Sequence, residues 1–123
     1  VIDMLNRLFL ALLIISPASF ADWGDVYYCQ MTSLVATDAD GTVKKYMLEK
    51  FQFKLDEEKN ALVFGQRGIF KDFVMDVEGL YPPIERWRGN SITAKMNFTE
   101  GKFFYAHVSS NNVDTITANC DKF

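Results

Sequence analysis

The sequence of 123 residues has few of the residues on which most enzyme active sites depend. It contains a single histidine, His107, and only two cysteines, Cys29 and Cys120. A Ser-His-Asp or Cys-His arrangement needs a histidine base, and a structural zinc site needs four ligands of these types. No phosphate-binding loop, dinucleotide-binding fingerprint or metal-binding helix motif is present either. We therefore expect no catalytic residues, no metal site and no cofactor.

Basic residues are not in excess. The 13 Lys and Arg against 16 Asp and Glu give a net charge of -3, with a pI near 5.1. Proteins that bind nucleic acids carry clustered positive charge, so we expect no nucleic-acid partner. The Asp-x-Asp-Gly sequence at 38–41 lacks the acidic residues that a calcium-binding EF-hand requires, because Ala36 and Met47 occupy those positions. We expect a plain turn there.

Long apolar runs are absent after residue 21, and the run before it is short. Arg7 precedes the apolar segment 8–15, and Ser19 and Ala21 place small residues where a signal peptidase cleaves. This pattern is typical of a secretory signal peptide. The alternative is an N-terminal membrane anchor, which the short run disfavours. We expect residues 1–21 to be removed, leaving residues 22–123 as a single soluble domain that is periplasmic or secreted, with no membrane span.

The remaining chain is rich in apolar and aromatic residues that alternate with polar ones. Apolar residues make up 49%, including eleven Phe, five Tyr and two Trp, which is enough to build the core of one domain. Alternation along short segments between turns is typical of half-buried strands. We expect strands over 26–35, 43–55, 61–65, 69–77, 84–90, 91–98, 103–108 and 113–120.

These segments predict an all-β fold, a small antiparallel meander of about eight strands closed into a barrel. The side-chain alternation within 43–55 changes parity near Glu49 and Lys50. Such a change predicts a bulge or bend, which is common where a sheet curls into a barrel. A two-sheet β-sandwich is the alternative architecture.

The two cysteines lie in the first and last predicted strands. In an exported chain of this size, two cysteines predict a disulfide, and Cys29–Cys120 is the one possible pairing. The loop that it closes holds about 90 residues, so the chain-entropy model assigns it about 4–5 kcal/mol of stabilisation. Barrel closure further predicts that strand 26–33 pairs directly with strand 113–120, which makes the cysteines a structural link and not a site.

Aromatic and arginine side chains provide the candidate binding surface. The segment around Trp87 combines residue types that are enriched at binding hot spots. The surface that we predict consists of Tyr81, Arg86, Trp87, Arg88, Tyr105 and His107. A structural alternative places Trp87 in the core, with the two arginines on the outer face of the same strand, and makes His107 a surface histidine. A second grouping joins Tyr28 to Phe103, Tyr105 and His107, if their side of the strands faces outward.

We expect an exported, non-enzymatic binding module whose partner is a protein or a component of the cell envelope. One alternative is a carrier that holds a small apolar ligand in a cavity lined by Phe51, Phe53, Phe73 and Met75. Another is a hydrolase, which would need a cleft around His107 or a pair of facing carboxylates.

The plan of the chain adds a further alternative. A signal peptide is followed by a small all-β domain with Tyr27-Tyr28-Cys29 near its start and Cys120 near its end. In this overall plan the chain resembles the periplasmic C-type lysozyme inhibitor barrels. The resemblance implies a periplasmic inhibitor of a lysozyme-like enzyme.

Overall fold

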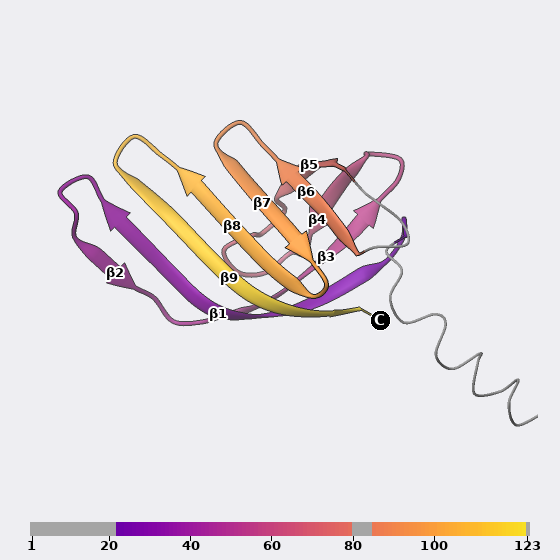
Figure 1. Cartoon of the computed structure of the whole chain (residues 1–123), viewed down its shortest axis with the longest axis horizontal. Coiled ribbons are helices and arrows are strands. Elements are labelled where there is room, and N and C mark those ends of the chain that lie inside the picture. Colours follow the sequence, from indigo (N-terminus) through magenta and orange to yellow (C-terminus); the bar gives the residue numbers. More distant parts are fainter. Residues whose placement is uncertain (1–21, 80–84, 123) are drawn as a thin grey trace, which may run out of the picture.

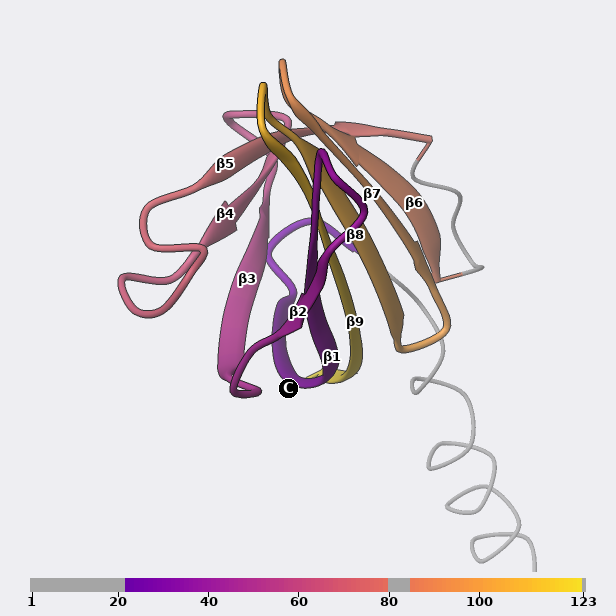
Figure 2. The same cartoon turned by 90° about the vertical axis from the view of Figure 1, so that its left-hand side faces the viewer.

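Nine antiparallel strands form one continuous sheet that closes on itself (Figure 1). The computed structural model describes residues 22–79 and 85–122. The strands are β1 (Val26–Asp38), β2 (Val43–Lys45), β3 (Lys50–Asp56), β4 (Ala61–Phe64), β5 (Val74–Glu78), β6 (Arg86–Asn90), β7 (Ala94–Thr99), β8 (Lys102–Val108) and β9 (Asn112–Lys122). Eight of them, β1 and β3 to β9, close into a barrel through the pairing of β1 with β9. The predicted all-β barrel is confirmed. Figure 2 shows β3 to β5 on one side of it and β6 to β8 on the other.

The closing seam between β1 and β9 is the longest pairing in the sheet. It extends from Tyr27 opposite Lys122 to Asp38 opposite Asn112, with one bulge between Met31 and Ser33. Cys29 lies directly opposite Cys120, and the two form a disulfide across 91 residues of sequence. The predicted disulfide and the predicted pairing of the first and last strands are both confirmed. The seam is therefore fixed by backbone hydrogen bonds and by a covalent bond.

One edge of β1 carries two strands in succession. Residues 26–30 pair with β3, whereas residues 35–37 pair with β2. Between these strands the chain leaves the sheet at residues 46–49, where the Met31 amide still donates to the Glu49 carbonyl. This is the bend that the change of alternation predicts. It leaves β2 outside the barrel as the start of a projection that we call the arm, comprising residues 34–49 and 107–114, at the left in Figure 1.

The predicted strand over residues 69–77 is wrong in its first half. Residues 66–72 form turns, and β5 begins only at Val74. The Asp72 amide donates to the Gly65 carbonyl at 3.1 Å and closes a compact loop. This loop places the Phe70 ring in the core, stacked on Phe64 at 4.6 Å. Burial of a large ring stabilises the turn more than continued strand pairing would.

The barrel interior is filled by aromatic and aliphatic side chains. Trp87 stacks on Phe98 with ring centroids 4.1 Å apart, and Tyr27 contacts both rings. The Tyr27 hydroxyl donates to Glu85 Oε2 at 2.9 Å, and its burial, reinforced by the nearby Glu85 carboxylate, raises its pKa. The largest fully buried side chains are Trp87, Tyr27, Phe53, Phe98, Phe103, Met31, Leu55, Leu62, Met75 and Ile116. An eight-stranded barrel is just wide enough for such side chains to fill it.

Candidate functional site

The side chains of the predicted binding surface do not form one patch. Arg86 and Arg88 point outward from β6, whereas Trp87 between them is only 1% exposed and belongs to the core. This alternation is the structural alternative that the sequence left open, and it removes Trp87 from any binding surface. Tyr81 lies outside the described residues.

Tyr105 and His107 lie on the inner side of the sheet, near the start of the arm. The Tyr105 ring packs edge-on against Phe70 at 4.9 Å, and it is 8% exposed. Burial, with a smaller contribution from Asp114, raises the pKa of Tyr105 to about 12. Tyr105 is therefore mostly a core residue, and Asp114 is the one carboxylate that adds to the effect of its burial.

His107 is a partly exposed side chain paired with one carboxylate. Its Nδ1 lies 3.6 Å from Asp114 Oδ2, its register partner on β9. This nitrogen is buried and makes no hydrogen bond within the described part of the chain. No hydrogen bond joins His107 Nδ1 to a hydroxyl or thiol of the described residues.

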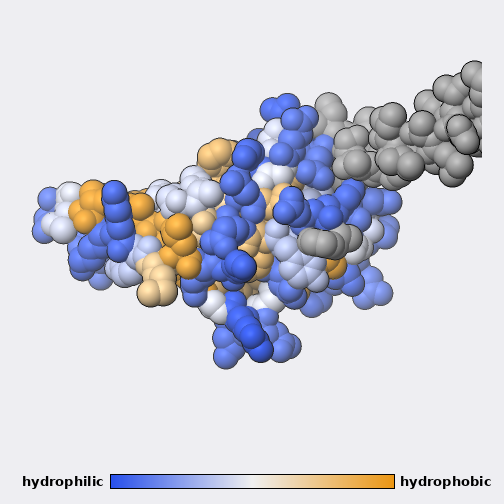
Figure 3. Space-filling model, turned by 90° about the horizontal axis from the view of Figure 1, so that it is seen from below, coloured by the Kyte–Doolittle hydropathy of each residue, from blue (hydrophilic) through white to orange (hydrophobic). Residues whose placement is uncertain are grey.

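The arm exposes more large apolar side chains than any other part of the described chain. Met47 is 88% exposed, and Tyr46 and Leu48 beside it are each about half exposed. Tyr46 and Met47, together with Ile69, border a groove of about 520 Å³ at the base of the arm. Its lining is Leu34, Tyr46, Met47, Glu49, Ile69, Asn112 and Asp114. Figure 3 shows hydrophobic surface over this end of the molecule, at its left. We call the exposed side chains of Tyr46, Met47, Leu48 and Ile69 the arm patch.

The other face of the arm is also apolar. Val43 and Val113 both lie beside Thr37 of β1, and Val113 lies opposite Val108 of β8. Their exposed fractions are 57%, 37% and 57% for Val43, Val113 and Val108. The arm therefore exposes apolar side chains on both faces, which is unusual for a sheet extension in water.

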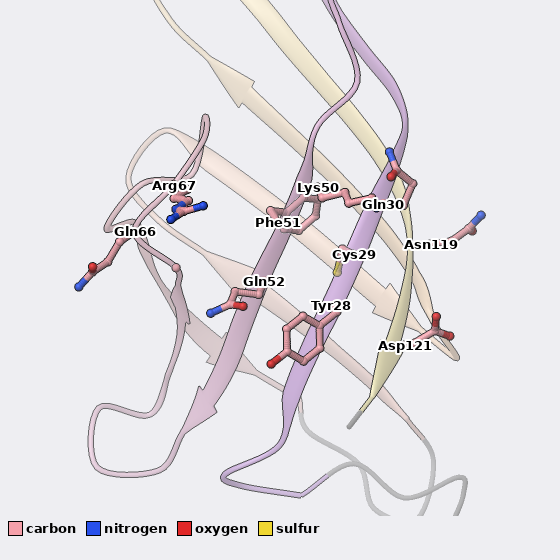
Figure 4. A pocket seen from close by; sticks show the side chains of 11 residues that line it. Tyr28, Cys29, Gln30, Lys50, Phe51, Gln52, Gln66, Arg67, Asn119 and Asp121 are labelled. Atoms are coloured by element: carbon pink, nitrogen blue, oxygen red, sulfur yellow. The ribbon is translucent and has the colours of Figure 1, made fainter.

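A second concave surface lies on the outer face of the barrel, across the β1–β9 seam. The register places two rows of outward side chains over β3, β1 and β9, first Lys50, Gln30 and Asn119, then Gln52, Tyr28 and Asp121. Gln66 and Arg67, from the loop after β4, form a wall beside them, and the whole groove has a volume of about 840 Å³. We call it the Tyr28 groove. Figure 4 shows Tyr28 beside Gln52, with Gln66 and Arg67 on the neighbouring loop and the Gln66 side chain directed away from Tyr28.

The grouping of Tyr28 with Phe103, Tyr105 and His107 does not occur in the structure. Tyr28 points outward from β1 and is 47% exposed, whereas Phe103 and Tyr105 point into the barrel. The residues around Tyr28 were missed from the sequence. Their outward alternation could be read from the sequence, and the last strand was expected beside the first. The register that aligns Lys50 and Asn119 with Gln30 could not be predicted.

Comparisons with family models, with curated protein sequences and with solved structures found no match to this chain. Within residues 22–79 and 85–122 there is no helix long and apolar enough to cross a membrane. The same residues contain no group of three or more metal-binding side chains. The two concave surfaces must therefore be interpreted from their own chemistry.

Proposed function

We propose that this chain is an exported, non-enzymatic binding module that recognises a protein partner through the arm patch. The observation that carries the proposal is the exposure of Tyr46, Met47, Leu48 and Ile69 at one end of the molecule. Soluble proteins rarely expose contiguous apolar surface unless a partner covers it. Met and Tyr are also among the residue types enriched at protein interfaces.

The packing of the barrel supports surface binding over transport of a ligand in the interior. Phe53 and Met75, which a carrier would need as cavity walls, are 1% and 0% exposed and pack among other core side chains. Phe51 packs against Phe70 and Phe103 at about 5 Å. Rings in such contact leave no room for a ligand between them.

The charges around the patch indicate the kind of partner. The arm carries four acidic side chains, Asp38, Asp40, Glu49 and Asp114, against two lysines, Lys44 and Lys45. Charge complementarity across an interface favours the opposite sign on the partner. The expected partner is therefore a protein surface with apolar side chains flanked by basic groups.

A second copy of this chain fits the arm less well. β2 has only three residues, two of them lysines, and Lys44 already lies 3.4 Å from Asp38. Short edge strands with lysines resist pairing with another edge strand, because the pairing would bring like charges together. The acidic arm also repels its own copy.

Export is supported by the disulfide, because such bonds persist in oxidising compartments. The signal-peptide pattern in residues 1–21 points the same way, although those residues lie outside the described structure. If the protein is periplasmic, the resemblance to C-type lysozyme inhibitors supplies one defined candidate partner, a lysozyme-like enzyme.

The test is selection from a displayed random-peptide library on the immobilised, disulfide-bonded protein. We expect enrichment of peptides that combine aromatic or aliphatic residues with Lys or Arg. Synthetic versions should bind the wild type, and the Met47→Asp variant should bind them at least tenfold more weakly, because a buried, unpaired carboxylate is costly. Ile92→Asp is the matched control, since Ile92 is a fully exposed apolar residue outside the arm.

Three results would contradict the proposal. They are the enrichment of no peptide family, equal binding by the wild type and Met47→Asp, or self-association of the chain through the arm in sedimentation experiments. A purified C-type lysozyme is tested in parallel for binding and for loss of lytic activity. Inhibition that Met47→Asp removes and Ile92→Asp retains would identify the partner class.

A further inference from the structure

The Tyr28 groove combines an exposed aromatic ring with amide side chains on a rigid floor. Its six floor residues come from three neighbouring strands, so adjacent side chains within a row are about 5 Å apart and the two rows about 7 Å apart. Cys29 and Cys120 lie between the two rows, on the inner face of the same strands. The disulfide therefore holds β1 and β9 together directly beneath the groove, and the floor is preorganised for a ligand.

The aromatic component is Tyr28. Its neighbour Tyr27 is fully buried in the core, whereas Tyr28 is 47% exposed on the floor of the groove. The face of an aromatic ring carries partial negative charge. It attracts the weakly positive C–H groups on one face of a sugar ring, so the two rings stack.

The amide component lies beside that ring. Gln52 is the direct register partner of Tyr28, whereas Gln66 belongs to the loop wall and its side chain points away from the ring (Figure 4). Neither side chain makes a hydrogen bond within the described ranges. A primary amide both donates and accepts hydrogen bonds, so it can pair with a hydroxyl group that acts as an acceptor or as a donor. Hydroxyl-rich ligands match this chemistry better than apolar ones do.

The loop wall is held close against this floor. The Gly65 amide donates to the Gln52 carbonyl at 3.0 Å, and a Cβ at Gly65 would lie 3.0 Å from Gln52 Cγ. Glycine at this position therefore lets the loop approach the Gln52 side chain. The close approach fixes the distance between the wall and the Tyr28 ring.

Two cations complete the groove. Lys50 lies on the floor and Arg67 on the wall, and neither forms an ion pair with another described residue. Asp121 is the one carboxylate that lines the groove, so its local charge is positive in a chain of net charge -3. Arginine binds carboxylates through two parallel hydrogen bonds. The groove thus matches a ligand that bears a negative group near a hydroxylated ring.

We propose that the Tyr28 groove binds an acidic saccharide, with a sugar ring on Tyr28, its hydroxyl groups on Gln52, and its carboxylate facing Arg67 and Lys50. Small β-barrels bind oligosaccharides on the outer face of their strands in the same general way. The site is separate from the arm, so it goes beyond the protein-binding function proposed above.

The test is isothermal titration of the disulfide-bonded protein with a uronic-acid oligosaccharide, a neutral hexose oligosaccharide of equal length and oligoglutamate. We expect saturable binding of the acidic sugar, at least tenfold tighter than that of the neutral sugar. Tyr28→Ala should weaken binding of the acidic sugar by about tenfold. The Lys50→Gln, Arg67→Gln double variant should bind the two sugars equally. Phe104→Ala removes a ring that is 51% exposed on β8, outside the groove, and should bind as the wild type does.

Several outcomes would overturn the assignment. No saturable binding of either sugar excludes a saccharide site, and equal affinity for the two sugars excludes recognition of the carboxylate. Binding of oligoglutamate as tight as that of the acidic sugar would reduce the groove to a nonspecific anion site. Wild-type affinity in Tyr28→Ala, with its fold confirmed by circular dichroism, would exclude stacking on the ring.

Discussion

The barrel and the arm share strands β1, β8 and β9 but differ in how far they bury apolar side chains. Within the barrel, Tyr27 and Met31 of β1 are at most 1% exposed, because other strands surround them on every side. Along the arm, which continues β1 beyond the barrel wall, Val43, Met47 and Val113 are exposed from about one third to almost nine tenths. No part of the described chain covers these three side chains, although Leu34 and Ala36 of the arm are buried. Burial in the barrel therefore accounts for the stability of the fold. The exposed apolar side chains of the arm do not contribute to that core, so folding alone does not explain them.

The largest expected effect comes from the disulfide, which lies in the barrel part of the β1–β9 seam. Replacing Cys29 and Cys120 together by Ala should lower the free energy of unfolding by about 4–5 kcal/mol, because the unfolded chain loses a constraint across about 90 residues. Urea unfolding of the variant and the wild type measures the loss. A loss below about 1 kcal/mol would mean that the seam is held by its hydrogen bonds alone.

Trp87 and Met47 test the comparison directly. Trp87→Ala removes a core ring stacked at 4.1 Å on Phe98 and should cost about 3–5 kcal/mol. Met47→Ala removes an 88% exposed side chain and should change stability by less than about 0.5 kcal/mol. Thermal unfolding of both variants provides the measurement. Similar losses would show that the arm patch is part of the folding core after all.

Gly89 tests how tightly the barrel core is packed at one position. A Cβ there would lie 2.7 Å from Cγ of Met96, its register partner, and 3.2 Å from Leu62 Cδ1. Gly89→Ala should therefore cost about 1–3 kcal/mol through overpacking. Arg88→Ala, on the outer face of the same strand, is the control and should stay within about 0.5 kcal/mol of the wild type in the same denaturation assay.

The smallest effect concerns pH and the boundary between the barrel and the arm, where Tyr105 lies. Its folded-state pKa of about 12 exceeds the unfolded value near 10. The stabilisation from its neutral phenol is therefore complete below pH 10 and is lost as the pH rises from 10 toward 12. The stability of Tyr105→Phe should fall less steeply than that of the wild type over that pH range, as a pH titration followed by circular dichroism would show. A slope equal to that of the wild type would show that Tyr105 does not contribute.

Much of the fold was predictable because alternation and cysteine count are local or unique signals. The alternation of apolar and polar side chains predicted most strands. The change in that alternation near Lys50 predicted the bend that separates β2 from β3. The loop around Phe70 was not predictable from the sequence. A buried aromatic residue produces the same local pattern in a strand as in a turn that inserts the ring into the core. The Tyr28 groove, whose floor joins residues from β1, β3 and β9, was not predictable either.

The sequence left a β-sandwich as the alternative to a closed barrel, but by itself it determined the all-β class and the one possible disulfide. These follow from the period of the side chains and from having only two cysteines, neither of which depends on distant contacts. The tertiary structure alone decided that Trp87 is core, that the arm is exposed and that Tyr28 has Gln52 on one side and Asp121 on the other. Which side chains share a surface depends on strand register and on where the barrel ends, and both are set by the packing of the whole sheet.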